Sequence, residues 1–210
     1  MGQHRMGVPE KETDYLRQNL SLDIFVEGGT FRGETAKRMS GLFSHVYTIE
    51  KSDHMYAEAQ KGLQNYSNIT QLKGDTREHL NEILEKHDNI LFWLDAHWSG
   101  GNTYGEGDEC PLLEELAIIF EHKKNYVILI DDARLFMAPP PLPHQAKDWP
   151  SVAQITRSIP DDWDVIIYED VIYLLHKEQL GFKAFLQETI TADHNNKGNF
   201  LERVQSKLRK

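Results

Sequence analysis

Four residues suited to acid, base or metal chemistry follow two apolar segments of the chain. Asp95 and His97 come after the run ILFWL, and Asp131 and Asp132 come after YVILI. If both runs are neighbouring parallel strands, their carboxyl ends bring the three acids together. Acids clustered without a cation would repel one another, and their oxygens suit Mg²⁺ or Ca²⁺. We therefore predict a metal site at Asp95, Asp131 and Asp132.

His97 lies two residues past Asp95, where an imidazole can take a proton from a hydroxyl near neutral pH. We predict His97 as the catalytic base, with Asp95 as the second catalytic residue. In the other interpretation His97 packs under a loop or hydrogen bonds to Asp95. Arg134 either binds an acidic group of a substrate or neutralises the acids, and we favour the second role.

A glycine loop, VEGGTFRGET (residues 26–35), follows the first β-rich run. Adjacent Gly28 and Gly29 let the backbone turn sharply and approach a ligand, and the helix that follows presents free N–H groups. The loop fits a nucleotide-like cofactor. It lacks the full G-x-G-x-x-G spacing of dinucleotide binders, which argues against a nicotinamide cofactor.

Two further acids have the spacing expected around such a cofactor. Glu50 lies about 20 residues after the glycine loop, where a carboxylate can accept hydrogen bonds from two ribose hydroxyls; the other interpretation is an exposed glutamate at a strand end. Asp75 precedes a helix that starts near Thr76, so it can cap that helix. The same carboxylate can also accept the amine hydrogen of an adenine lying beside the turn.

These residues need a scaffold of alternating strands and helices. Nearly continuous apolar runs suit strands buried on both faces, and their alternation with helices predicts a parallel sheet covered by helices. We therefore predict an α/β fold with a Rossmann-like, doubly wound, mostly parallel sheet. The predicted strands lie within residues 23–29, 45–52, 69–75, 89–97 and 126–133, and the helices within 33–42, 53–63, 77–86 and 110–123.

The pattern changes after residue 133. The proline loop (residues 136–150) contains a stretch that cannot be regular helix or central strand, and it should overhang the substrate site. Its Phe136, Met137, His144 and Trp149 suit stacking on a sugar or an aromatic ring.

Beyond the proline loop, residues 152–159 have helical spacing, and residues 164–177 predict two antiparallel strands that fold back at Glu169 and Asp170. We predict a single domain over residues 1–210, with its core at 23–176 and C-terminal helices at 177–210. The apolar faces of those helices could pair two subunits as a homodimer.

The composition restricts the classes of partner. Hydrophobic residues make up 40% and charged residues 27%, as in soluble globular proteins. No apolar run reaches the roughly 18 residues that cross a bilayer, so we expect no membrane partner. No signal-peptide core is present, and the single Cys110 agrees with a reducing compartment, so we expect a cytoplasmic protein. Acids exceed bases by 33 to 23, and the charge of −10 should repel nucleic acid.

The order of these segments, over roughly residues 23–176, resembles the class I S-adenosylmethionine-dependent methyltransferases. VEGGTFRGETA looks like their first motif, Glu50 like their ribose-binding acid, and GDTREHL like their adenine-side turn. The resemblance implies S-adenosylmethionine as the cofactor, with Glu27 near its amino acid end. The implied cofactor-binding residues are Glu27, Gly28, Gly29, Thr30, Arg32, Glu50, Asp75, Thr76 and Asp95.

The acids at the two later strand ends are similar to those of metal-dependent O-methyltransferases of the catechol and macrolide-sugar types. There the metal holds two vicinal oxygens of the substrate. This resemblance implies O-methylation of a small hydroxylated substrate such as a sugar, with Mg²⁺ as a second cofactor. Residues 99–110 have no counterpart that we can map, and Asp108 and Glu109 within them either add metal ligands or cap the helix at Pro111.

Three other functions stay open. A nucleotide-sugar or NAD-dependent enzyme would use the same ribose-binding acid. A metal-dependent hydrolase could hold its cation at Asp95, His97 and Asp131. In a non-catalytic cofactor-binding protein, the acids and His97 would form only a charge network.

Overall fold

Seven strands form one sheet in the computed structural model of the protein, which describes residues 7–97, 108–179 and 181–208. The order is β3-β2-β1-β4-β5-β7-β6, with β1 to β5 parallel and β7 antiparallel to both β5 and β6. The predicted Rossmann-like fold is therefore confirmed. The strands are β1 Ile24–Gly28, β2 His45–Glu50, β3 Ile69–Lys73, β4 Asn89–Leu94, β5 Asn125–Ile130, β6 Trp163–Tyr168 and β7 Val171–His176.

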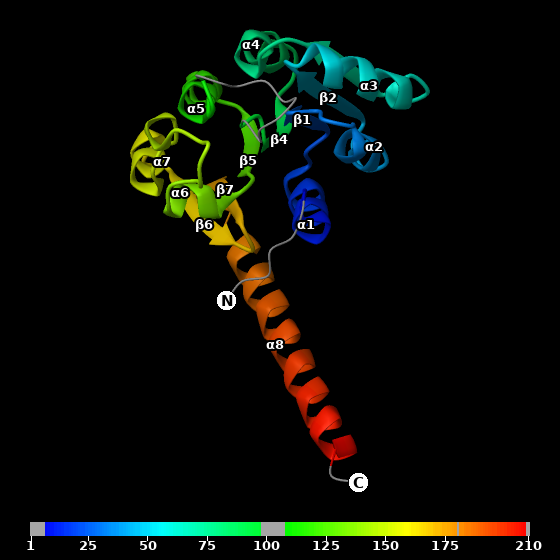
Figure 1. Ribbon diagram of the computed structural model, residues 1–210, viewed down its shortest axis with the longest axis vertical. Helices are drawn as coiled ribbons and strands as arrows, with labels where there is room; N and C mark the ends of the chain where they lie inside the picture. Colours follow the sequence, from blue (N-terminus) through cyan, green and yellow to red (C-terminus); the bar gives the residue numbers. More distant parts are fainter. Residues whose placement is uncertain (1–6, 98–107, 180, 209–210) are drawn as a thin grey trace. The chain divides into compact units, whose positions relative to one another are not determined.

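Helices cover both faces of this sheet, with α5 and α7 on one side and α1 and α2 on the other (Figure 1). Helix α1, which precedes the first strand, was not predicted from the sequence. The helices are α1 Glu10–Leu20, α2 Glu34–Ser40, α3 Asp53–Leu63, α4 Thr76–Lys86, α5 Leu112–Glu121, α6 Ala133–Met137, α7 Val152–Ser158 and α8 Gly181–Leu208.

The central strands are buried on both faces. Val26, Phe92 and Ile128 belong to a core cluster that also contains side chains of α4, α5 and α7. The intervening residues, such as Phe25 and Trp93, are fully buried as well. Burial on two sides explains why these strands have continuous apolar sequences rather than alternating ones.

The predicted hairpin is present at the end of the sheet. Glu169 and Asp170 form its two-residue turn, with φ angles of 46° and 72°. Two successive left-handed residues match the twist of antiparallel strands, and aspartate tolerates this conformation better than most residues. The turn thus fixes the register of β6 and β7.

Contacts divide the chain into two units, Met1–His176 and Lys177–Lys210. In the second unit α8 is one continuous helix, where one or two helices were expected. Helix α6 ends at Met137, inside the proline loop, and the rest of that loop contains no regular helix or strand apart from a 3₁₀ turn at Ala146–Asp148. Among the described helices, none is long and apolar enough to cross a membrane.

Replacing Gly29 by alanine should destabilise the fold. Gly29 has a φ of +92°, and a Cβ atom there would lie 2.5 Å from the carbonyl oxygen of Asp95. We expect Gly29→Ala to lower the free energy of unfolding by about 1–3 kcal/mol in urea denaturation. Gly41→Ala is the matched control, because the nearest atom there lies at 3.5 Å and φ is −79°. Equal effects of the two substitutions would contradict this account.

Candidate functional site

Backbone hydrogen bonds beyond the strand ends bring the predicted segments together along one edge of the sheet. Each bond joins the carboxyl end of one strand to the segment that follows a neighbouring strand. The loops after β1, β2, β3, β4 and β5 therefore lie side by side, as the sequence analysis requires. The bonds are Asp95 N to Gly28 O (3.1 Å), Gly29 N to Ile49 O (3.0 Å), Gly74 N to Glu50 O (3.0 Å) and Asp131 N to Leu94 O (3.2 Å).

Glu50 fastens the glycine loop to the end of β2. Its Oε2 accepts a hydrogen bond from Phe31 N at 2.9 Å, and its Oε1 accepts one from Ser52 N at 2.8 Å. A carboxylate oxygen has two lone pairs, so each oxygen keeps acceptor capacity for one more hydrogen. Two adjacent ribose hydroxyls would need two such acceptors.

Glu27 is a buried carboxyl beneath the glycine loop. The hydroxyl of Thr48 lies 2.6 Å from its Oε2 and 2.7 Å from Thr30 Oγ1. Burial raises the pKa of Glu27 to about 8, and the charge of Asp95 adds to the rise, while hydrogen bonds from Thr48 and Thr35 oppose it. The group is therefore poised to lose a proton when a positive charge comes close.

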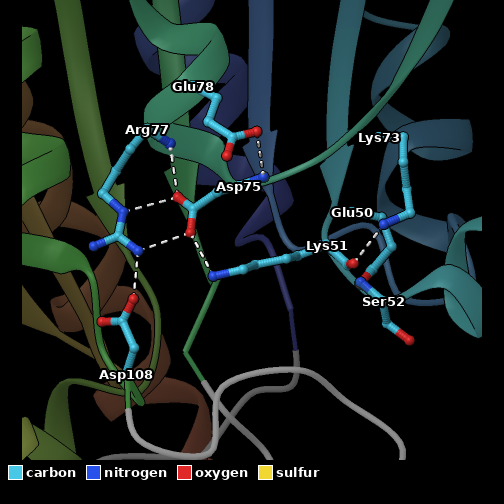
Figure 2. A network of polar contacts seen from close by, with 8 residues as sticks. All are labelled: Glu50, Lys51, Ser52, Lys73, Asp75, Arg77, Glu78 and Asp108. Atoms are coloured by element: carbon cyan, nitrogen blue, oxygen red, sulfur yellow. Dashed lines mark hydrogen bonds and ion pairs between the residues drawn. The ribbon is translucent and has the colours of Figure 1, made fainter.

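Asp75 caps α4 in a capping box with Glu78, which confirms its predicted structural role. Both of its carboxylate oxygens are also engaged by cations (Figure 2). Arg77 donates from Nε to Oδ1 at 2.8 Å and from Nη2 to Oδ2 at 2.7 Å, and Lys51 Nζ donates to Oδ2 at 2.8 Å. Burial raises the pKa of Asp75, but these hydrogen bonds outweigh it and hold the pKa well below its usual range. Adenine recognition by Asp75 stays a prediction.

Glu115 of α5 is a buried carboxyl behind this turn that the sequence analysis missed. Burial raises its pKa to about 7, the charge of Asp75 raises it further, and a hydrogen bond from Thr76 opposes both. The predicted Thr76 is itself only 3% exposed. A glutamate on the apolar face of α5 was the available signal.

At the ends of β4 and β5, His97 lies among carboxylates. Its Nε2 is 3.1 Å from Asp132 Oδ2 and 3.6 Å from Asp95 Oδ1. Arg134 Nη1 lies 2.6 Å from Asp132 Oδ1 and also pairs with Asp170. Arg134 therefore neutralises the acids, which is the role we favoured.

The pKa values at this end follow from that arrangement. Burial lowers the pKa of His97, but the carboxylates of Asp132 and Asp95 outweigh it and raise the pKa to about 9. Burial raises the pKa of Asp95 to about 6 and that of Asp131 to about 8. This pKa favours the imidazolium form of His97 at neutral pH, and its role as the catalytic base stays a prediction.

The arrangement does not fit the predicted metal site. One oxygen of Asp132 faces Arg134 and the other faces His97, while Asp131 Oδ1 accepts a hydrogen bond from Asp132 N at 2.8 Å. Across the described part of the chain, no group of three or more histidine, cysteine or acidic residues is placed to hold a metal ion. The Mg²⁺ prediction for Asp95, Asp131 and Asp132 is therefore not supported.

Glu109 anchors the proline loop to this end of the sheet. Only 2% of it is exposed, and it accepts hydrogen bonds from Trp149 Nε1 at 2.8 Å and Gln145 N at 3.0 Å. His144 Nδ1 lies 3.1 Å from the same carboxylate. The ring of Trp149 lies 5.3 Å from that of His97, so the proline loop does return to the predicted site. Glu109 therefore anchors the proline loop, and these contacts are neither those of a metal ligand nor those of a helix cap.

Arg32 is the predicted residue that the structure does not bring to the others. Its Nε pairs with Glu58 of α3 at 3.3 Å, and its guanidinium lies 5.2 Å from the centre of the Phe31 ring. The side chain is 64% exposed. Arg32 therefore makes its contacts at the protein surface, beside the glycine loop.

In comparisons by sequence, no protein-family model and no curated protein matches this chain. Its structure is similar to a methyltransferase from Podospora anserina bound to SAH, at 15% identity and a TM-score of 0.56 over 81% of this chain and 80% of that one. An O-methyltransferase from Bacillus cereus in complex with SAH is similar at 14% identity and a TM-score of 0.55, over 80% of each chain. An rRNA methylase from Streptococcus thermophilus is similar at 14% identity and a TM-score of 0.51, over 82% of this chain and 98% of that one. The chain thus has the Rossmann-like fold of methyltransferases.

Glu109→Gln should destabilise the protein. A glutamine offers one acceptor oxygen to donors that now share two, and it turns an N–H group toward them. Because Glu109 is buried, we expect a loss of about 1–3 kcal/mol in the free energy of unfolding, measured by urea denaturation. Glu114→Gln, on the exposed side of the same region, should change it by less than about 0.5 kcal/mol. A stability equal to the wild type in Glu109→Gln would show that the anchor is not needed.

Proposed function

We propose that this protein is an S-adenosylmethionine-dependent methyltransferase that acts on a hydroxyl group of a small molecule. The observation that carries the proposal is the Glu50 carboxylate, held by Phe31 N and Ser52 N with one further acceptor position on each oxygen. Two solved proteins of this fold are bound to SAH, S-adenosylhomocysteine, which supports the choice of cofactor.

The residues present fit the two ends of that cofactor. The glycine loop allows close approach at Gly29, and Glu50 would accept from the ribose hydroxyls. Glu27, a buried carboxyl with a raised pKa, would ionise against the ammonium of the amino acid end. Asp75 and Thr76 would lie at the adenine. When bound, the cofactor supplies a methyl group on a positively charged sulfur.

The residues at the ends of β4 and β5 would orient the methyl acceptor and take its proton. In an O-methylation the acceptor oxygen forms a bond to the methyl carbon, the carbon–sulfur bond breaks with its electrons on sulfur, and the acceptor loses a proton. The Asp95 carboxylate, with a pKa of about 6, is ionised at neutral pH and can take this proton. His97, as an imidazolium beside it, would hold Asp95 and Asp132 in place. Alignment of the acceptor supplies much of the remaining rate.

A small hydroxylated acceptor fits this end better than a nucleic acid. The net charge of −10 opposes a phosphate backbone, although one protein of similar fold is an rRNA methylase. The rings of Phe136 and Trp149, which lie 5.9 Å apart, are buried in the core, so the predicted stacking of a sugar or an aromatic ring on these two side chains is not supported. We propose no metal-assisted step, because His97 and Arg134 already occupy the oxygens of Asp132.

Calorimetric titration with S-adenosylhomocysteine tests the proposal. We expect the metal-stripped protein to bind it, and Glu50→Ala to weaken binding at least about tenfold, because charge-assisted hydrogen bonds to two hydroxyls are lost. Glu82→Ala, an exposed glutamate of α4 paired with Lys86, is the control and should bind like the wild type. Added Mg²⁺ should leave the affinity unchanged.

Other outcomes point to the other functions. Absence of binding with and without Mg²⁺ would refute the proposal and direct attention to nucleotide sugars, NAD and metal-dependent hydrolysis. Binding that requires Mg²⁺ would restore the metal site at the acids. Binding without methyl transfer to any hydroxylated acceptor would favour a non-catalytic cofactor-binding protein.

Cofactor binding should release a proton from Glu27. Its pKa of about 8 keeps it protonated at pH 7, and an adjacent ammonium group lowers that pKa, so the proton leaves on binding. Calorimetry in buffers of different ionisation enthalpy should show release of about one proton at pH 7, decreasing as the pH rises through about 8. Glu27→Gln should abolish this release. Proton uptake, or release that persists in Glu27→Gln, would contradict the assignment.

A further inference from the structure

Asp75 has no acceptor capacity left in the ligand-free protein. Oδ1 accepts from Arg77 N at 3.0 Å and Arg77 Nε at 2.8 Å, and Oδ2 accepts from Arg77 Nη2 at 2.7 Å and Lys51 Nζ at 2.8 Å. These four contacts match the four acceptor positions of a carboxylate. An adenine amine can bind Asp75 only if one of these donors leaves.

Lys51 is the donor that can leave. Arg77 holds Asp75 with two parallel bonds and is itself fixed by Asp108 (Figure 2). Lys51 makes a single contact with Asp75, and its side chain is 32% exposed. Of the two cations on Asp75, Lys51 is the more exposed, at 32% against 25% for Arg77, and its single bond holds it less firmly than the two parallel bonds hold Arg77.

The position of Lys51 relates it to the expected base. It directly follows Glu50, and its side chain runs from the end of β2 to Asp75 (Figure 2). Lys73 Nζ donates to the Lys51 carbonyl oxygen at 2.6 Å, which holds the backbone while the side chain turns. The alkyl chain of Lys51 thus runs from beside the predicted ribose acceptor to the predicted adenine acceptor, where its ammonium lies.

We propose that Lys51 determines which purine base the cofactor site accepts, by exchanging with the amine of adenine at Asp75. This inference rests on the proposed function. An adenine amine is a hydrogen-bond donor, so it must displace the ammonium and takes its place on Oδ2. Hypoxanthine carries a carbonyl at the same position, which accepts a hydrogen bond from the ammonium and needs no displacement. Lys51 therefore opposes adenine and favours hypoxanthine.

The test compares S-adenosylhomocysteine with S-inosylhomocysteine, its deaminated analogue, by calorimetry on Lys51→Met. Methionine keeps an unbranched side chain, one heavy atom shorter than that of lysine, and removes its charge. We expect the affinity for S-adenosylhomocysteine to rise about twofold to fivefold, because no ion pair has to break. The affinity for S-inosylhomocysteine should fall about tenfold, because a charge-assisted hydrogen bond is lost.

Two control variants separate this effect from a general change of charge. Lys124→Met removes a lysine that pairs with Asp88 and is 21% exposed, and it should leave both affinities unchanged. Lys51→Arg keeps a cation for Asp75, and the ratio of its two affinities should be that of the wild type. Affinities that move in the same direction in Lys51→Met, or do not move, would overturn the proposal. The proposed function fails separately, if the wild type does not bind S-adenosylhomocysteine.

Discussion

The site depends on the contact between the glycine loop and the end of β4. The backbone at Gly29 lies so close to the carbonyl oxygen of Asp95 that a side chain has no room there. This approach fixes where the loop turns, and the turn in turn places Phe31 N on the Glu50 carboxylate. A loop held further out would leave Glu50 without its backbone partner. One steric constraint between two neighbouring strands therefore sets the geometry of the predicted ribose acceptor.

Charge compensation is the second organising feature of this edge. Asp75 has Arg77 and Lys51, and Asp132 has His97 and Arg134, so each of these carboxylates faces two cations. Glu27 has hydroxyl partners instead and a raised pKa. In a protein with a net charge of −10, the Asp75 and Asp132 carboxylates of the edge are thereby compensated by cations. Among the carboxyls with a raised pKa, Glu27 is the one beneath the glycine loop, where an incoming ammonium would meet it.

Much of the fold was predictable from sequence because its signals are local. Buried strands read as apolar runs, and the short link at Glu169 and Asp170 allows only a hairpin. The first helix, α1, was missed although Pro9 and the first-turn acid Glu10 are start signals. The site residues lie in the loops that directly follow the strands, so they were predictable once the strands had been placed.

The partners of those residues were not predictable, because they come from distant parts of the chain. Glu109 meets Trp149 across 40 residues, and Lys51 meets Asp75 across 24. The metal was expected because three acids cluster, although a charge network of His97 with these acids was also open from the sequence. The hairpin turn is another distant partner: Asp170 accepts from Ala133 N and Arg134 N and pairs with the Arg134 side chain. During synthesis on a ribosome, the strands β1 to β3 and the predicted cofactor residues that follow them would be complete first. The site at the ends of β4 and β5 would lack its contacts with Asp170 until the hairpin turn had emerged from the exit tunnel.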